Sequence, residues 1–363
     1  MRTVKLKEIT LNITDGKHGD CRDSYNSEYY FISCKDIKNG KVFYEEARQI
    51  TKEDFYEAHK RTNLEVNDIL LTNSGTIGRM AFVEDGELAA RTTFQKSVAI
   101  IKPNAELIVP KYLYYVLLNS VDTLTNHSNG SAQKNLLLST LRDFPLKIHF
   151  YKETQDRVAS ILAKYDALIE NNQKQIKLLE EAAQRLYKEW FVDLRFPGHE
   201  DVEFIDGLPK GWSEKLLIDV AEIQYGYSFD GKLFNSNGEG NPIVRIRNIS
   251  DGVTSDFTTE EADNDYIIHN GDIIVGMDGE FHINSWCGHD AYLVQRTCSI
   301  RPYDENMKGF IFQAIYEPIK FFEATLVGAT VAHLGKKHLD TIKIKIAPDK
   351  LLCPSKTMFV KSE

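Results

Sequence analysis

The chain has 363 residues, 42% of them hydrophobic, and a formal net charge of −9 at pH 7. This length allows two domains that each bury a core, and the negative charge argues against a surface that is basic throughout, as a chain coated for nucleic acid would need. The sequence shows no uninterrupted apolar stretch of about 18 residues and no signal peptide, so we expect a cytoplasmic protein.

Charge is divided unevenly along the chain. Residues 1–150 contain 20 basic and 19 acidic residues, residues 151–195 contain eight of each, and residues 196–363 contain 16 basic and 26 acidic residues. We therefore expect DNA binding by the chain alone to be weak. The five cysteines form no CxxC motif, and no histidine cluster has zinc spacing, so we predict reduced thiols and no metal site.

One sequence pattern occurs twice in the chain. Five framework segments of the first copy recur in the second in the same order, with loops of different length between them. The paired segments are residues 5–16 with 215–226, 31–37 with 243–249, 68–75 with 272–279, 95–100 with 295–300, and 130–148 with 328–346. This alignment sets Leu6 beside Leu216 and Gln95 beside Gln295. We infer a duplication in which the framework is shared and the loops have diverged.

Each copy is predicted to mix α and β structure. Residues 97–102 and the alternating residues 342–346 are predicted as strands, and residues 110–118 and 308–316 as buried helices. Asp68 and Asp272 each precede an apolar strand, which favours a turn leading into that strand over a catalytic acid.

Polar loops separate these elements, and they differ between the copies. Residues 75–78 and 129–134 are rich in side chains that form hydrogen bonds, and their counterparts at 277–280 and 328–337 have different polar content. A shared framework with different polar loops suits two readers of two different short DNA sequences.

A long helix is predicted between the copies. Residues 153–190 contain neither glycine nor proline, and their apolar residues alternate at three- and four-residue steps, as in a coiled-coil seam. The seam consists of Val158, Leu162, Tyr165, Ile169, Asn172, Ile176, Leu179, Ala183, Leu186 and Trp190. Asn172 is either a solvent-facing residue or a buried amide that fixes the register. Such a seam needs a partner helix, and a helix of roughly 55 Å can act as a spacer.

Catalytic motifs are absent from the sequence. The chain has no GxxxxGK[ST], GxSxG or HExxH motif, and no Asn-Pro-Pro-Tyr-like loop of the kind that holds a flipped base in a methyltransferase. We predict that the chain itself catalyses no reaction.

Several short motifs recur in a fixed order around the central helix. They are Asp68-Ile-Leu-Leu-Thr72 with Gly75-Thr-Ile-Gly78, Gly130-Ser-Ala-Gln133, the helix end at 186–191, Leu208-Pro-Lys-Gly-Trp212 with residues 221–226, and Gly271-Asp-Ile-Ile274. In this order they resemble the DNA specificity subunit of a type I restriction-modification system, over about residues 1–348.

The resemblance implies an α/β (α+β) fold with two target recognition domains, at residues 1–150 and 196–348, separated by a coiled-coil spacer helix at 151–195. Each domain would read one half of a split double-stranded DNA target, and the spacer would set the gap and dock modification (methyltransferase) subunits. A restriction (translocase and nuclease) subunit would complete the complex. We expect no cofactor in this chain, and S-adenosylmethionine, ATP and Mg on the partner subunits.

Basic and amide side chains of the polar loops are the candidates for DNA contact. Those expected to position phosphates are Lys134, Lys336 and Lys337. Those expected to contact bases are Lys17, His18, Gln133, Arg245, Arg247 and His333. For each of them, the alternative is an ordinary surface-loop residue without DNA contact.

The sequence departs from the family pattern at its end. Residues 349–363 form a short tail in place of the second spacer helix that the family ordinarily has, so we expect a truncated subunit. Such a subunit could pair with a second copy through its spacer, recruit one modification subunit instead of two, or be inactive. The alternatives are a recognition module detached from a modification methyltransferase, and a structural protein assembled through its coiled coil.

Overall fold

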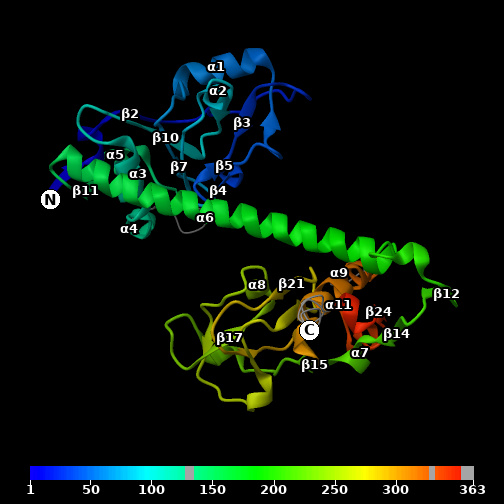
Figure 1. Ribbon diagram of the computed structural model, residues 1–363. Helices are drawn as coiled ribbons and strands as arrows, with labels where there is room; N and C mark the ends of the chain where they lie inside the picture. The colour runs from blue at the N-terminus through cyan, green and yellow to red at the C-terminus, as the bar shows by residue number, and fades with distance from the viewer. Residues whose placement is uncertain (127–134, 327–331, 353–363) are drawn as a thin grey trace. The chain divides into compact units, whose positions relative to one another are not determined.

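The computed structural model describes residues 1–126, 135–326 and 332–352, and the chain divides into two compact units, Met1–Gln173 and Lys174–Glu363. Each unit mixes helices and strands (Figure 1), which confirms the predicted α/β (α+β) class. The domain boundaries at residues 150, 195 and 348 stay predictions. The predicted tail begins with the short helix α11 (Asp349–Leu352), and its remainder lies outside the described residues.

A four-stranded antiparallel sheet forms the centre of the first unit. Its strand order is β2 (Thr10–Asp15), β10 (Val98–Pro103), β7 (Ile69–Thr72) and β8 (Met80–Phe82). β10 is apolar on both faces because both are covered: Ala99 and Ile101 join the cluster that includes α3 (Pro110–Leu118), and Val98 and Ile100 join a second cluster. The predicted strand at 97–102 and the predicted helix at 110–118 are therefore confirmed.

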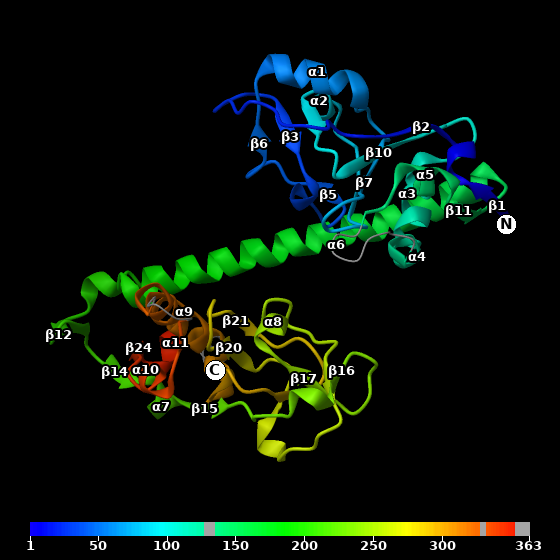
Figure 2. The ribbon, with the colours of Figure 1, turned by 180° about the vertical axis from the view of Figure 1, so that it is seen from behind.

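A second layer covers the other face of this sheet. It is the three-stranded sheet β6 (Arg48–Gln49), β3 (Tyr30–Ile32) and β9 (Thr92–Phe94), in which β3 and β9 are parallel. Figure 2 shows β3 and β6 beside the first α-helix of the chain, α1 (Lys52–Thr62). Helix α1 begins after Thr51, whose hydroxyl accepts a hydrogen bond from the Asp54 N–H, and it stacks Phe55 on Tyr29 with ring centroids 4.4 Å apart. The strand β1 (Arg2–Lys5) pairs with β11 (Pro145–Ile148) and joins the two ends of the repeat. The remaining elements are β4 (Ile37–Lys38), β5 (Lys41–Val42), α2 (Gly86–Ala89), α4 (Val121–Asn126) and α5 (Leu138–Asp143).

The second unit repeats this topology. Its four-stranded sheet has the order β15 (Ala221–Tyr225), β23 (Thr297–Pro302), β20 (Ile273–Gly276) and β21 (Ile283–Ser285). β17 (Asn241–Val244) runs parallel to β22 (Ala291–Leu293), and β14 (Ser213–Leu216) pairs with β24 (Lys343–Ile346), as β3 pairs with β9 and β1 with β11 in the first unit. The strand predicted at 342–346 is confirmed, and the helix predicted at 308–316 is α9 (Lys308–Thr325), which runs further than expected. The duplication inferred from the sequence is thus a duplication of structure.

One detail of the sequence alignment between the copies is wrong near the start of each copy. In the pairing of β2 with β10, the register shifts between Lys102 and Pro103, so β2 contains a β-bulge with one extra residue. Leu6 therefore corresponds to Leu217 and not to Leu216. Both leucines are buried, and their N–H groups make equivalent bonds, to Phe144 O at 3.0 Å and to Ile342 O at 2.8 Å.

A second detail is wrong at the turn before β10. The Lys96 N–H donates to Lys17 O, and in the second unit the Gln295 N–H donates to Tyr227 O. Gln295 therefore corresponds to Lys96 and not to Gln95, and Arg296 corresponds to Ser97. The sequence alignment is off by one residue here because each copy has a glutamine in this turn, at positions that differ by one residue.

Helix α6 (Lys152–Tyr187) is continuous over 36 residues and ends in a π-helical turn, Lys188–Val192. One stripe of it packs on the first unit. The Gln155 side chain accepts from Val109 N at 2.9 Å and donates to His149 O at 2.8 Å, Ala159 is buried, and Tyr115 donates to Asp166 at 2.6 Å. The seam positions lie one residue before this stripe, about 100° around the helix.

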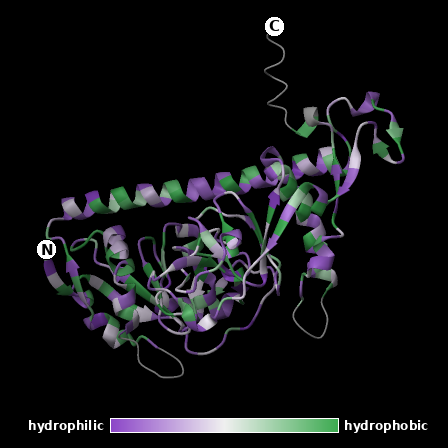
Figure 3. Ribbon diagram, turned by 90° about the horizontal axis from the view of Figure 1, so that it is seen from below, coloured by the Kyte–Doolittle hydropathy of each residue, from purple (hydrophilic) through white to green (hydrophobic). Residues whose placement is uncertain are grey.

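The predicted seam is therefore largely open. Val158 packs partly buried on the first core, but the exposed fraction is 38% at Leu162 and reaches 70% at Leu179. Tyr165, Ile169, Ile176 and Leu186 are also exposed. Hydrophobic and hydrophilic residues alternate along the whole of α6 (Figure 3). The helix therefore exposes an apolar stripe along most of its length.

Candidate nucleic-acid interface

Four polar segments meet at one end of the central sheet in the first unit. They are residues 16–18 after β2, residues 73–79 between β7 and β8, the turn 95–97 before β10, and Asn135, which forms a bridge with Ser74. Backbone hydrogen bonds hold them together: the Lys17 N–H donates to Phe94 O at 2.8 Å, the Asn73 N–H to Ser97 O at 3.0 Å, and the Leu136 N–H to Asn73 O at 2.8 Å. We call this group of segments the loop edge.

The second unit has an equivalent loop edge. The Tyr227 N–H donates to Leu293 O at 2.8 Å, the Met277 N–H to Arg296 O at 2.9 Å, and the Leu334 N–H to Met277 O at 2.7 Å. Each of these bonds matches one in the first unit, and the bridge between Asp278 and His333 matches the bridge between Ser74 and Asn135. The framework therefore presents side chains from equivalent backbone positions in both units.

Close backbone packing fixes the start of each loop edge. An added Cβ at Gly16 would lie 2.1 Å from Phe94 O, and one at Gly226 would lie 2.1 Å from Val294 O. Only glycine allows this approach. The shared glycine at the end of β2 and β15 is thus explained by geometry.

The side chains at equivalent positions of the two loop edges differ in chemistry. The first unit presents the neutral residues Ser74, Ser97 and Asn135. The second presents the charged or ionisable residues Asp278, Arg296 and His333. In the second unit these groups are joined: Asp278 Oδ1 lies 2.5 Å from His333 Nδ1, and Asp278 Oδ2 lies 3.4 Å from Arg296 Nε.

Two candidates of the first unit lie at its loop edge. Lys17 is mostly buried and its Nζ lies 3.2 Å from Glu57, and His18 is exposed with Nε2 3.0 Å from Asp15. Burial disfavours the charge of Lys17, but the hydrogen bond to Glu57 and nearby acidic groups outweigh it and raise the pKa of Lys17. His18 is the more accessible of the two. The other two candidates, Gln133 and Lys134, lie outside the described residues.

The candidates of the second unit fall into two groups. His333 lies at the loop edge, and the exposed Lys336 and Lys337 follow it at the start of α10 (Lys336–Leu339). Arg245 and Arg247 lie at the start of α8 (Ile246–Ile249). There the Arg245 guanidinium stacks over Phe234 at 5.3 Å, and Arg247 forms a two-point ion pair with Asp256.

His338 anchors the lysine pair next to the loop edge. Its Nδ1 accepts a hydrogen bond from the Gly335 N–H at 2.9 Å, which requires an unprotonated Nδ1. Burial, with Lys337 and His333 nearby, lowers the pKa of His338 and so favours this neutral form. The bond caps α10 and so fixes the position of Lys336 and Lys337 in its first turn.

A buried ion pair supports the strand behind each loop edge. Asp68 accepts from the Glu65 N–H at 2.8 Å and pairs with Lys102 at 2.7 Å, and Asp272 accepts from the His269 N–H at 3.0 Å and pairs with Arg301 at 3.0 Å. The predicted turns into the strands are confirmed. Burial raises the pKa of the Asp68 carboxyl, although Lys102 favours its charged form. The sequence analysis missed the basic partners, which lie 34 and 29 residues further along the chain.

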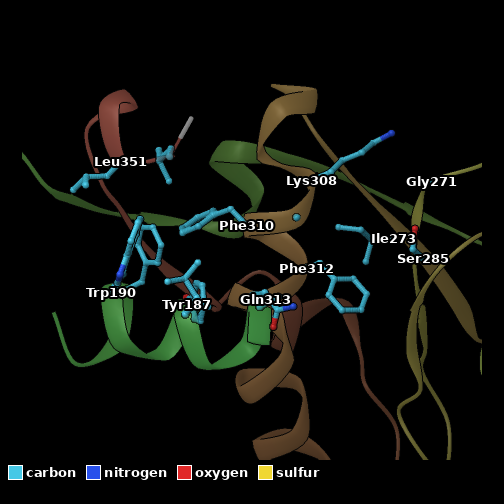
Figure 4. Close-up of a pocket in the computed structure, with 15 residues that line it drawn as sticks. Tyr187, Trp190, Gly271, Ile273, Ser285, Lys308, Phe310, Phe312, Gln313 and Leu351 are labelled. Carbon is cyan, nitrogen blue, oxygen red and sulfur yellow. The ribbon is translucent and has the colours of Figure 1, made fainter. Parts of the chain in front are cut away.

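A cavity of about 430 Å³ lies in the second unit beside the end of α6. Its aromatic wall is formed by Tyr187, Trp190 and Phe310, and Leu351 of α11 lies next to it (Figure 4). Phe310 also packs on Phe191, with ring centroids 4.8 Å apart. The seam residues Ala183, Leu186 and Trp190 line this cavity, so the apolar stripe of α6 continues into a hollow surface.

Among residues 1–126, 135–326 and 332–352, no group of three or more His, Cys, Asp or Glu side chains is placed to hold a metal ion. None of the described helices is long and apolar enough to cross a membrane.

Comparison with known proteins gives a consistent family. The model of the family described as Type I restriction modification DNA specificity domain matches residues 3–181 and 209–350, one match for each copy. The MjaIX specificity subunit of Methanocaldococcus jannaschii, from a type I restriction enzyme, is 30% identical over 349 residues, 91% of this chain and 79% of that protein. The EcoBI specificity subunit of Escherichia coli is 31% identical over 138 residues, 38% of this chain and 29% of that protein.

A solved structure has a similar fold. The crystal structure of the type I restriction-modification S subunit from M. genitalium superposes with a TM-score of 0.52 at 15% identity, covering 99% of this chain and 88% of that one.

Proposed function

Because this chain belongs to the type I restriction-modification DNA specificity family, we propose that each of its two units reads one half of a split double-stranded DNA target through its loop edge. The repeated loop edge is the observation that carries this proposal. The same backbone bonds present side chains at the same places in both units, but the side chains differ. Two equal frameworks with different reading groups suit two different half-sites.

Family membership confirms the resemblance drawn from the sequence. The chain is a type I restriction-modification specificity subunit, and its role in the system is recognition rather than catalysis.

The proposal extends to the partners of the chain. The exposed stripe of α6 and the apolar cavity at its end would dock helices of modification subunits, because an apolar stripe of this kind is stabilised by burial against another helix. Those subunits would hold S-adenosylmethionine, and a restriction subunit would hold ATP and Mg. The net charge of −9 fits a division of labour in which the partners contribute much of the affinity for DNA phosphates.

Co-expression with the modification subunit tests the proposal. Size exclusion with mass determination should give a complex, and methylome sequencing should give a motif of two different short sequences separated by unspecified bases. A palindromic motif with one repeated half-site would indicate pairing of two copies through α6 instead. A complex that leaves the methylome unchanged would contradict the proposal.

A further inference from the structure

Arg296 has an unusual position at the loop edge of the second unit. It lies in the turn before β23 with a φ of 72°, in the left-handed region that a non-glycine residue rarely adopts. The side chain is 56% exposed. A strained backbone that projects a long basic side chain from a turn is typical of a functional residue.

The contacts of Arg296 orient its guanidinium without enclosing it. Nε lies 3.4 Å from Asp278 Oδ2, and Nη1 lies 3.4 Å from His333 Nδ1. The other oxygen of Asp278 is 2.5 Å from His333, so a single carboxylate fixes both groups. The Nε and Nη1 contacts are long, which leaves the guanidinium able to take a better acceptor.

Three other arginines of the second unit are held more tightly than Arg296. Arg301 donates to Asp272 at 3.0 Å and to Ile267 O at 2.5 Å, Arg195 donates to Glu189 at 2.7 and 2.8 Å, and Arg247 is paired at two points with Asp256. Residues 196–363 are acidic overall, and Arg296 at the loop edge and the exposed Lys336 and Lys337 at the start of α10 are cationic exceptions.

We propose that Arg296 reads a guanine in the half-site of the second unit, and that Asp278 and His333 are positioning residues for it. A guanidinium forms two parallel hydrogen bonds to O6 and N7 of guanine in the major groove, and no other base offers that pair of acceptors. The equivalent residue of the first unit is Ser97, so the first half-site is read by other groups. This inference rests on the proposed function.

The test uses the chain co-purified with its modification subunits and a library of random-sequence duplex DNA. The wild-type complex should select two separated half-sites, one of which contains a required G·C pair. Arg296→Ala should lower the preference for G at one position of that half about tenfold or more, which corresponds to the loss of one bidentate contact. Arg296→Lys, which keeps the charge but not the fork, should lose most of the preference.

Two further variants separate reading from positioning. Asp278→Asn should weaken the preference for G while total DNA binding at the same salt concentration stays equal or rises, because a negative charge is removed from the interface. Arg195→Ala is the matched control, since Arg195 is 55% exposed and ion-paired but lies after the π-helical turn that follows α6, and its motif should equal that of the wild type.

The outcomes distinguish the inference from the proposed function. A wild-type split motif that Arg296→Ala and Arg296→Lys leave unchanged would overturn the inference alone. A wild-type complex with no sequence preference would overturn the proposed function and the inference with it.

Discussion

The buried pair of Asp68 and Lys102 shows how single residues support the loop edge. The two side chains are only 5% and 13% exposed, and the strand that follows Asp68 leads directly to the loop edge. A carboxylate buried this deeply is stable only with its countercharge and its backbone donor. The same arrangement in the second unit, Asp272 with Arg301, indicates that the framework depends on it.

Replacing Lys102 by Met should destabilise the first unit by about 3 kcal/mol or more, because the Asp68 charge is then buried without a partner. The pKa of Asp68 is already raised by burial, so a folded protein without Lys102 binds this proton more tightly than the unfolded chain does. The loss should therefore be largest at neutral pH and should shrink as the pH falls through the raised pKa. Urea unfolding followed by circular dichroism at pH 7 and pH 5 measures both effects.

The chain contains its own control for this experiment. All three tryptophans, Trp190, Trp212 and Trp286, lie in the second unit, so the fluorescence transition should not move. Lys7→Met, which removes an exposed pair with Asp143 that is about half accessible at both ends, should leave the unfolding transition close to that of the wild type. Equal losses for Lys102→Met and Lys7→Met would contradict the argument.

Sequence alone could find some of the residues proposed to read DNA and not others. His333 was named because it is a polar residue in a divergent loop. Asp278 and Arg296 were missed because their importance comes from the meeting of three loops that are distant in sequence, which no local pattern reveals. Arg247 was named for its charge, but Asp256, nine residues later, already pairs with it.

Among the helices and strands, the spacing of apolar residues predicted the long helix well but did not predict a local irregularity such as a β-bulge. The helix predicted at 153–190 is α6 with its π-helical turn, because an uninterrupted heptad pattern is a strong signal. The bulge in β2 at Leu11 was not predicted, since one extra residue in a strand leaves the surrounding apolar pattern almost unchanged. The sequence did not reveal the cavity beside α9, because its walls come from separate segments of the chain, and two of its aromatic residues, Tyr187 and Phe310, are more than 100 residues apart.

The stripe of α6 makes a clear prediction about assembly. Ile169→Lys with Ile176→Lys should change the melting temperature little, because both side chains are more than half exposed, and should abolish co-purification with modification subunits. The matched control is Asn171→Lys with Leu178→Lys, which adds the same charges at the same spacing on another face of the helix. If the control pair abolishes co-purification as fully as the seam pair does, binding does not depend on the stripe.

In the whole molecule, one continuous helix, α6, runs from one proposed DNA-reading unit into the other. The family match occurs twice, with the first match extending into α6 and the second following it, and the sheet topology repeats once on each side of α6. Under the proposed function, the length of α6 should set the number of unspecified base pairs between the two half-sites.

Duplicating residues 167–173 tests this claim most directly. The insertion adds one heptad, keeps the seam in register and lengthens α6 by about 10 Å, the rise of about three base pairs. A seven-residue glycine and serine insertion after Gly238, in an exposed loop, is the control and should leave the motif unchanged. Methylome sequencing should show both half-sites retained and the gap between them longer by about three base pairs. A methylated motif with an unchanged gap, or with altered half-sites, would contradict the account.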